Sequence, residues 1–163
     1  MSALMLPTNI EELNRLKNEC FGMVAQRAAL SAGGTLVPLP GVDLAVDVGL
    51  LMELLPAINR RFGLAKDQIE EFDPRLKIFI YQVIIDLGGK LVGQLITKQL
   101  IMQILKRVGI RVAAKSVAKF IPFLGQAVAA SLSFGAMTIV GNSHVMDCYR
   151  VAEHIINNKP PEV

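Results

Sequence analysis

Residues 31–55 read SAGGTLVPLPGVDLAVDVGLLMELL, and a similar pattern, FIPFLGQAVAASLSFGAMTIV, returns at residues 120–140. In each copy a proline stands three residues before a glycine, and an apolar stretch follows. Because proline fixes φ and disfavours helix in the residue before it, each copy predicts a turn followed by a new helix. Small residues then recur every four positions, which places them on one helix face that permits close backbone approach. The sequence predicts that the two helices pair through Gly41, Ala45, Gly49, Gly125, Ala129 and Ser133.

The composition indicates one domain with a large core. The chain has 163 residues, of which 52% are hydrophobic and 19% charged. Its two cysteines are too few for a disulfide scaffold and indicate buried free thiols in a reducing compartment, so we expect a location on the cytosolic side. The N-terminus lacks a basic region followed by a long apolar run, and we therefore expect no signal peptide.

Helical spacing predicts a single all-α domain of about six or seven helices over residues 1–157, with a flexible polar tail at 158–163. A capping box of Thr8 and Glu11 predicts the first start, and Pro56 predicts a kink or break. Asp73 and Pro74 predict another start. An apolar, β-branched set in residues 76–85 also fits a buried strand, although the neighbouring patterns favour helix. The predicted helices cover residues 8–31, 41–61, from 73 onward, 90–109, 110–119 and 124–156.

The late segment Phe120–Met146 contains no Asp, Glu, Lys or Arg and is long enough to span a bilayer. It also carries seven polar residues, from Gln126 to His144, which makes its hydropathy borderline. Two interpretations stay open for this stretch, a buried helix of a soluble bundle and a membrane-inserted helix.

Positive charge is concentrated in one part of the chain, whose net charge is +3. Residues 87–146 contain seven basic residues and no acid, whereas both flanking segments are net acidic. Four of these basic residues recur every four positions and would form a ridge on a continuous helix. Anionic lipid headgroups fit such a ridge, and so does a solvated face or pairing with acids such as Glu70 and Glu71. The ridge consists of Arg107, Arg111, Lys115 and Lys119.

The motifs of enzymes and cofactor sites are missing or incomplete. The nearest approach to a phosphate-binding loop, at Gly89 and Lys90, has Leu91 where a hydroxyl is needed. Asp43 and Asp47 share a helix face but lack further acids for a metal cage, so ion pairs or helix-end charges explain them.

His144, Asp147 and Cys148 also share a helix face, but no second ligand pair completes a zinc site. A structural histidine and a buried thiol are therefore the favoured interpretation. Without tryptophan or a nucleic-acid motif, nucleic acid is not an expected partner. We expect no enzyme activity, no cofactor and no metal.

The turn motifs resemble those of a known helical domain. They are Pro38, Pro40, Gly41 and Asp43, then Phe62, Gly63 and Leu64, and then Ile121, Pro122 and Gly125. Residues 28–149 are similar to the helical domain that follows the GTPase domain in immunity-related GTPases and in a related bacterial, YcjF-like family of uncharacterised, often membrane-associated proteins. The GTPase domain is absent, so the resemblance transfers no catalytic residue. It implies an interaction or membrane-association module.

Together these features predict a non-enzymatic helical module that associates with an anionic membrane surface or a membrane-bound partner. The alternative is a soluble protein-binding or structural helical domain that works with a separate partner such as a GTPase. A homo-oligomer is compatible with either function.

Overall fold

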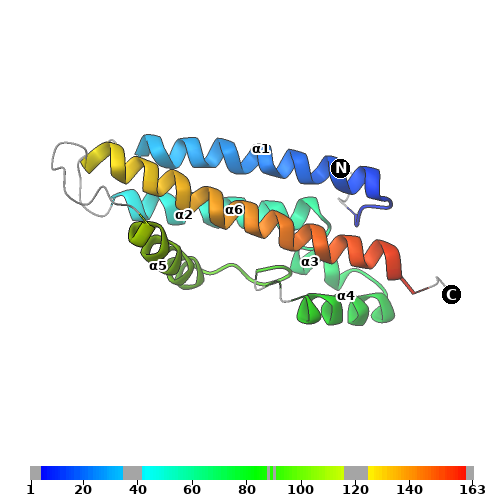
Figure 1. Ribbon diagram of the computed structural model, residues 1–163. Coiled ribbons are helices and arrows are strands. Elements are labelled where there is room, and N and C mark those ends of the chain that lie inside the picture. The colour runs from blue at the N-terminus through cyan, green and yellow to red at the C-terminus, as the bar shows by residue number, and fades with distance from the viewer. Residues whose placement is uncertain (1–4, 35–41, 88, 90, 116–124, 161–163) are drawn as a thin grey trace. The chain divides into compact units, whose positions relative to one another are not determined.

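The computed structural model describes residues 5–34, 42–87, 89, 91–115 and 125–160, without the side chains of 32–34, 42–45, 109–115 and 125–133. Over these ranges the chain forms helices and turns and no strand, which confirms the all-α class there. The expected number of helices stays a prediction, because residues 35–41 and 116–124 lie outside the described part. The helices in Figure 1 are α1 (Ile10–Gly34), α2 (Val42–Arg61), α3 (Lys66–Glu70), α4 (Pro74–Asp86), α5 (Lys98–Lys115) and α6 (Gly125–Asn158).

The cap of α1 lies one residue later than the sequence predicts. The Asn9 side chain accepts a hydrogen bond from the Glu12 backbone N–H at 2.8 Å. The Glu12 carboxylate accepts from the backbone N–H and the hydroxyl of Thr8, at 2.9 and 3.0 Å. The predicted pair of Thr8 and Glu11 is therefore wrong, because asparagine caps a helix at least as well as threonine and stands beside it.

α2 continues through Pro56 without interruption, so the predicted break at this proline is wrong, while the alternative of a kink stays a prediction. Proline removes the amide that would bond to the carbonyl four residues earlier, which belongs to Met52. Both Met52 and Pro56 are exposed, so water can bond to that carbonyl. The helix carries its proline on the solvent-facing side.

The chain divides into two compact units, and α1, α2 and α6 each contribute a part to both. Neither unit is contiguous in sequence, and the predicted domain boundaries stay a prediction. Unit 1 comprises Met1–Phe21, Leu55–Leu95 and Ser143–Val163, and unit 2 comprises Gly22–Leu54 and Ile96–Asn142.

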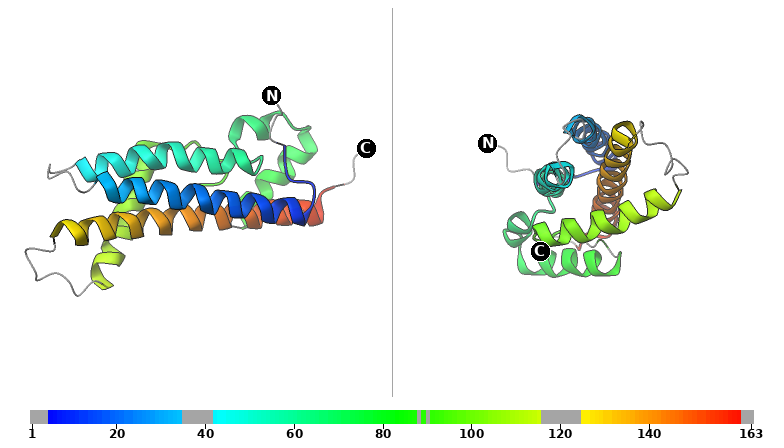
Figure 2. Two further views of the ribbon diagram at one scale, coloured as in Figure 1. Left: turned by 90° about the horizontal axis from the view of Figure 1, so that it is seen from above. Right: turned by 90° about the vertical axis from the view of Figure 1, so that its left-hand side faces the viewer.

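In unit 1 the N-terminal part of α1 lies beside the C-terminal part of α6 (Figures 1 and 2). The Tyr149 hydroxyl donates to the Asn14 side chain at 3.2 Å, and the Lys17 ammonium lies 4.5 Å from the centroid of the Tyr149 ring. α4 also contacts α6, with the rings of Phe79 and His154 6.4 Å apart. The core of this unit includes the buried side chains of Leu13, Leu55, Ile58, Phe62, Leu64, Ile69, Ile80 and Ile155.

A tight turn follows α2 and packs against the N-terminal segment. Gly63 has a φ of 71°, in the left-handed region that glycine adopts readily. A Cβ atom on Gly63 would lie 2.6 Å from the backbone nitrogen of Leu6. The Phe62-Gly63-Leu64 element is therefore a structural turn in which the middle position requires glycine.

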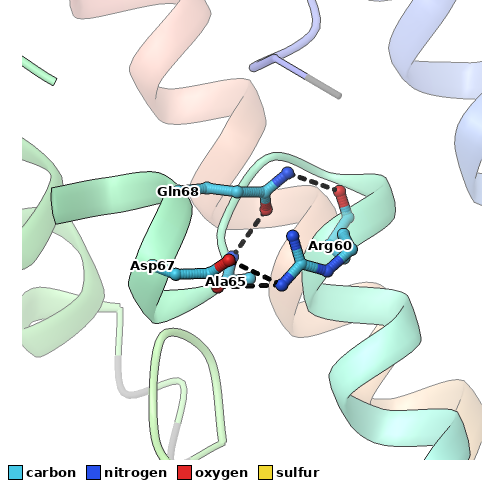
Figure 3. A network of polar contacts seen from close by, with 4 residues as sticks. All are labelled: Arg60, Ala65, Asp67 and Gln68. Carbon is cyan, nitrogen blue, oxygen red and sulfur yellow. Dashed lines mark hydrogen bonds and ion pairs between the residues drawn. The ribbon is translucent and has the colours of Figure 1, made fainter. Parts of the chain in front are cut away.

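Polar contacts hold α3 to the end of α2 (Figure 3). The Arg60 guanidinium donates to both carboxylate oxygens of Asp67, at 2.9 and 2.7 Å, and this contact lowers the pKa of Asp67. The Gln68 side chain accepts from the Ala65 backbone N–H at 3.0 Å and donates to the Arg60 carbonyl at 3.3 Å. These bonds satisfy backbone groups that helix ends leave without partners.

α4 begins where the sequence predicts. The Asp73 carboxylate accepts from the backbone N–H groups of Arg75 and Leu76, at 3.0 and 3.1 Å, and Pro74 is the first helical residue. The strand interpretation of this segment is wrong. The helix buries one face formed by Leu76, Ile80, Val83 and Ile84.

α5 begins at Lys98, and the predicted start near residue 90 is wrong. Residues 91–97 instead form a turn in which Gly93 has a φ of 66°. Thr97 then caps the helix, because its hydroxyl oxygen accepts from the Leu100 backbone N–H at 3.2 Å. α5 also continues past Gly109, so the predicted boundary between two helices at this glycine is wrong.

In unit 2, α1 contacts both α2 and α6. The buried Ser31 hydroxyl donates to the buried Asp47 carboxylate on α2. A Cβ atom on Gly141 of α6 would lie 2.7 Å from both γ-carbons of Val24 on α1. The core of this unit includes Val24, Ala28, Leu51, Leu54, Ile101, Leu105, Met137 and Val140.

Candidate functional site

α5 carries exposed cations and no acid. Ile101 and Leu105 are buried and attach the helix to unit 2. Lys98, Lys106 and Arg107 are exposed, and the residues from Lys98 to Lys115 include no Asp or Glu. Exposed neighbours on the same helix are neutral, namely Gln99, Met102 and Gln103.

Several arginines and lysines of the other helices pair with acids within the described part, as in Arg27 with Glu53 at 3.2 Å and Lys77 with Glu70 at 2.9 Å. Within the same ranges, Lys98, Lys106 and Arg107 form no ion pair. Their charge is therefore available to an anionic partner.

Part of the predicted basic ridge lies on the same helix. Arg107 is exposed on α5, and the positions of Arg111 and Lys115 belong to the same uninterrupted helix. Four-residue spacing on one helix places these three positions along one side. Lys119 lies outside the described residues. The predicted ridge does not include Lys98 and Lys106, although the sequence contains no acid near either residue.

The predicted pairing face of small residues can be examined at one position. A Cβ atom on the exposed Gly49 would meet no heavy atom within 4 Å, and the side chains of its predicted partner positions on α6 lie outside the described residues. Gly41 lies outside the described residues, and pairing through the remaining positions stays a prediction. Those positions are helical, without described side chains, at Ala45, Gly125, Ala129 and Ser133.

A close helix contact lies at Gly141 of α6, against Val24 of α1, and the small-residue spacing did not predict it. Val24 is β-branched and therefore stiff at χ1, so it cannot easily move away from an added methyl group. An isolated glycine inside a long helix lowers helix stability and often has a packing reason, which was the available signal.

A second group of predicted residues forms a buried polar cluster in unit 1. The Cys148 thiol donates to the Asn59 side-chain oxygen at 3.4 Å, and its sulfur lies 3.8 Å from Nε2 of His144. The Asn59 amide donates to the Leu91 carbonyl at 3.1 Å, which fixes the turn before α5. All three side chains are buried.

The electrostatics of this cluster favour neutral groups. Burial lowers the pKa of His144 to about 4, while an interaction with the Leu55 backbone opposes this shift only in part. Burial also raises the pKa of the Cys148 thiol well above its usual value. A nucleophilic cysteine needs the thiolate, which this environment disfavours. The cluster is therefore a structural histidine and a buried thiol, as the sequence analysis favours.

Neither acidic candidate completes a metal site in the part described. Asp147 is partly exposed and lies 3.4 Å from the Arg150 guanidinium, and Asp47 accepts from Ser31. The side chain of Asp43 is outside the described residues. Within the described residues, no group of three or more His, Cys, Asp or Glu side chains is placed to hold a metal.

Among the helices as far as they are described, none is long and apolar enough to cross a membrane. Residues 120–124 of the uncharged segment lie outside the described part of the chain. Comparisons with protein-family models, curated proteins and solved structures found no match for this chain. The resemblance to the helical domain of immunity-related GTPases therefore stays a prediction.

Proposed function

We propose that this chain is a non-enzymatic helical module that associates with an anionic membrane surface through the exposed cations of α5. The observation that carries this proposal is the set of exposed cations at Lys98, Lys106 and Arg107, which have no acidic partner among the described residues. Each basic side chain near an anionic bilayer contributes about 1 kcal/mol. The predicted ridge extends the same surface through Arg111, Lys115 and Lys119.

The mode of association that we propose is electrostatic and peripheral. Such binding decreases with ionic strength, because salt screens charges separated by more than a Debye length of about 8 Å at physiological salt. Met102 is 43% exposed between Lys98 and Lys106 and would add a small apolar contact. The resemblance noted at residues 28–149 implies a location near membranes and agrees with this proposal.

A flotation assay with neutral and anionic vesicles, at low and high salt, tests the proposal. We expect the protein to float with anionic vesicles at low salt and to stay at the bottom with neutral vesicles. Changing Arg107, Arg111, Lys115 and Lys119 together to Gln should weaken flotation. Binding that survives high salt and alkaline washing would contradict peripheral association and indicate insertion. Failure to float with either vesicle type would contradict membrane association and favour the alternative, a soluble domain with a protein partner.

A further inference from the structure

The outward face of α4 exposes two large aliphatic side chains at matching positions. Ile78 and Ile85 are 70% and 71% exposed, and they are seven residues apart, or about two helical turns. The buried side of α4 faces the opposite direction and packs into unit 1 through residues such as Ile80 and Val83. The exposed isoleucines are therefore additional to the core and not its edge.

The exposed residues of α4 follow the spacing of a helix-pairing seam. Arg75, Ile78, Gln82 and Ile85 are separated by three, four and three residues, as in the apolar seam of paired helices. All four side chains are exposed. This seam is short and half polar, so a partner helix must supply complementary charge as well as apolar contact.

The charges on this face of α4 are complementary to those on the same face of a second copy. Arg75 lies at the start of α4 and Asp86 at its end, both exposed and eleven residues apart. At about 100° per residue, these two positions differ by only about 20° around the helix, so they lie on the same flank of the isoleucine line. An antiparallel copy related by a two-fold axis brings that flank of one helix against the same flank of the other. Arg75 of each copy then faces Asp86 of its partner.

The isoleucine pair and the Arg75–Asp86 pair require nearly the same register of the two helices. Pairing Ile78 with the partner's Ile85 places the two-fold axis midway between them, and pairing Arg75 with the partner's Asp86 shifts it by one residue. A shift of the axis by one residue moves the two helices by two residues relative to each other, about 3 Å, which an arginine side chain can span.

The opposite flank of α4 is already occupied within the same molecule. The Glu70 carboxylate accepts from the Lys77 ammonium at 2.9 Å and from the Tyr81 hydroxyl at 2.8 Å. On the free flank, the Gln82 side chain donates to Asp86 at 2.9 Å and holds the carboxylate on the outward face. The charges available to a second copy are thus on one side only.

We propose that α4 is a homodimerisation surface, in which two copies of this chain pair their α4 helices antiparallel through Ile78 and Ile85, with Arg75 and Asp86 joined across the interface. Two helices of 13 residues bury less than the roughly 1,200 Å² of a standard interface. The dimer is therefore weak and exchanges with the monomer. This proposal does not depend on the membrane proposal.

Sedimentation velocity of the full chain between about 10 μM and about 1 mM measures the monomer–dimer equilibrium. Wild type should sediment faster as its concentration rises. Ile78→Glu and Ile85→Glu should each lower the association constant at least about tenfold, because each buries an unpaired charge in the contact. Leu30→Glu, on α1 and also at an exposed leucine (57%), is the matched control and should dimerise like wild type.

A charge exchange separates pairing from folding. Arg75→Glu and Asp86→Arg should each weaken the dimer about fivefold to tenfold, and the double variant should restore it to within about twofold. Both changes place a charge that the helix dipole favours, so neither should lower the melting temperature of the monomer. Wild type that stays monomeric throughout, a double variant no better than the single ones, or equal loss in Leu30→Glu would overturn the proposal.

Discussion

Gly63 joins two requirements that only glycine meets, a positive φ and direct contact with another backbone segment. We predict that Gly63→Ala destabilises the protein by about 2 kcal/mol or more, because an L residue is strained there and its Cβ would overlap Leu6. Urea unfolding at pH 7.5 measures this change. Gly22→Ala is the control, because a Cβ on Gly22 would lie in open space within α1. It should stabilise the protein by about 0.5–1 kcal/mol.

The buried His144 should make the stability of the protein depend on pH. Burial lowers its folded-state pKa to about 4, whereas the unfolded value is about 6.5. Between these values the unfolded state binds more protons, so stability is complete above pH 6.5 and decreases as the pH falls toward 4. Between pH 7.5 and pH 5 this one group should remove about 2 kcal/mol from the free energy of unfolding.

The variant His144→Gln isolates this contribution, because glutamine does not titrate in that range. Chemical denaturation at several pH values should show a smaller decrease for His144→Gln than for wild type between pH 7.5 and pH 5. Hydrogen bonds lower the pKa values of Glu12, Asp67 and Glu70 in the folded state. Their contributions are lost mainly at lower pH, as each carboxylate is protonated. Equal slopes for the two proteins in this window would contradict a buried neutral His144.

The contact between α1 and α6 is tested by two glycines of the same helix. Gly141→Ala should destabilise the protein by about 1–3 kcal/mol, since its Cβ would meet Val24 at 2.7 Å. Gly135→Ala should instead stabilise it by about 0.5–1 kcal/mol, because a Cβ there meets nothing within 4 Å. Thermal and urea unfolding measure both changes. Val24→Ala should reduce the cost of Gly141→Ala, and a cost that stays the same would show that the contact is not its cause.

Helices with strong local signals could be predicted from the sequence, and helices whose limits depend on packing could not. Asp73 followed by Pro74 fixes the start of α4 through its own side-chain hydrogen bonds. The start of α5 depends instead on Gly93, whose positive φ places it against the Ile84 and Ile69 side chains. The apolar residues of 90–109 have helical spacing both in the turn before Lys98 and in the helix after it, so periodicity alone could not locate the turn.

The candidate site shows the same division. The lack of acids around the α5 cations was readable from the sequence, whereas the absence of ion pairs to them depends on where the other helices place their carboxylates. Small residues at four-residue spacing predicted a close contact at Gly49, but spacing cannot tell which glycine faces a neighbour. Among the described residues, a close helix contact lies at Gly141 of α6, against Val24 of α1.

At the scale of the whole molecule, the all-α class follows from the helical spacing and is confirmed over the described residues. The charge distribution follows from the sequence as well, because residues 87–146 contain seven basic residues and no acid. Together these features support the central proposal that α5, which carries most of these basic residues, binds an anionic bilayer surface.

The most direct test is the partition coefficient of three proteins on vesicles with about a third anionic lipid. The first is wild type. The second, the α5 variant, combines the three changes Lys98→Gln, Lys106→Gln and Arg107→Gln. The third is a control that combines Arg15→Gln, Lys66→Gln and Arg150→Gln. The control removes three exposed cations from α1, α3 and α6, so both variants have the same net charge.

We predict that the α5 variant loses roughly 100-fold in binding, from about 1 kcal/mol per cation, while the control stays within about threefold of wild type. Equal loss in both variants, or unchanged binding of the α5 variant, would contradict association through α5.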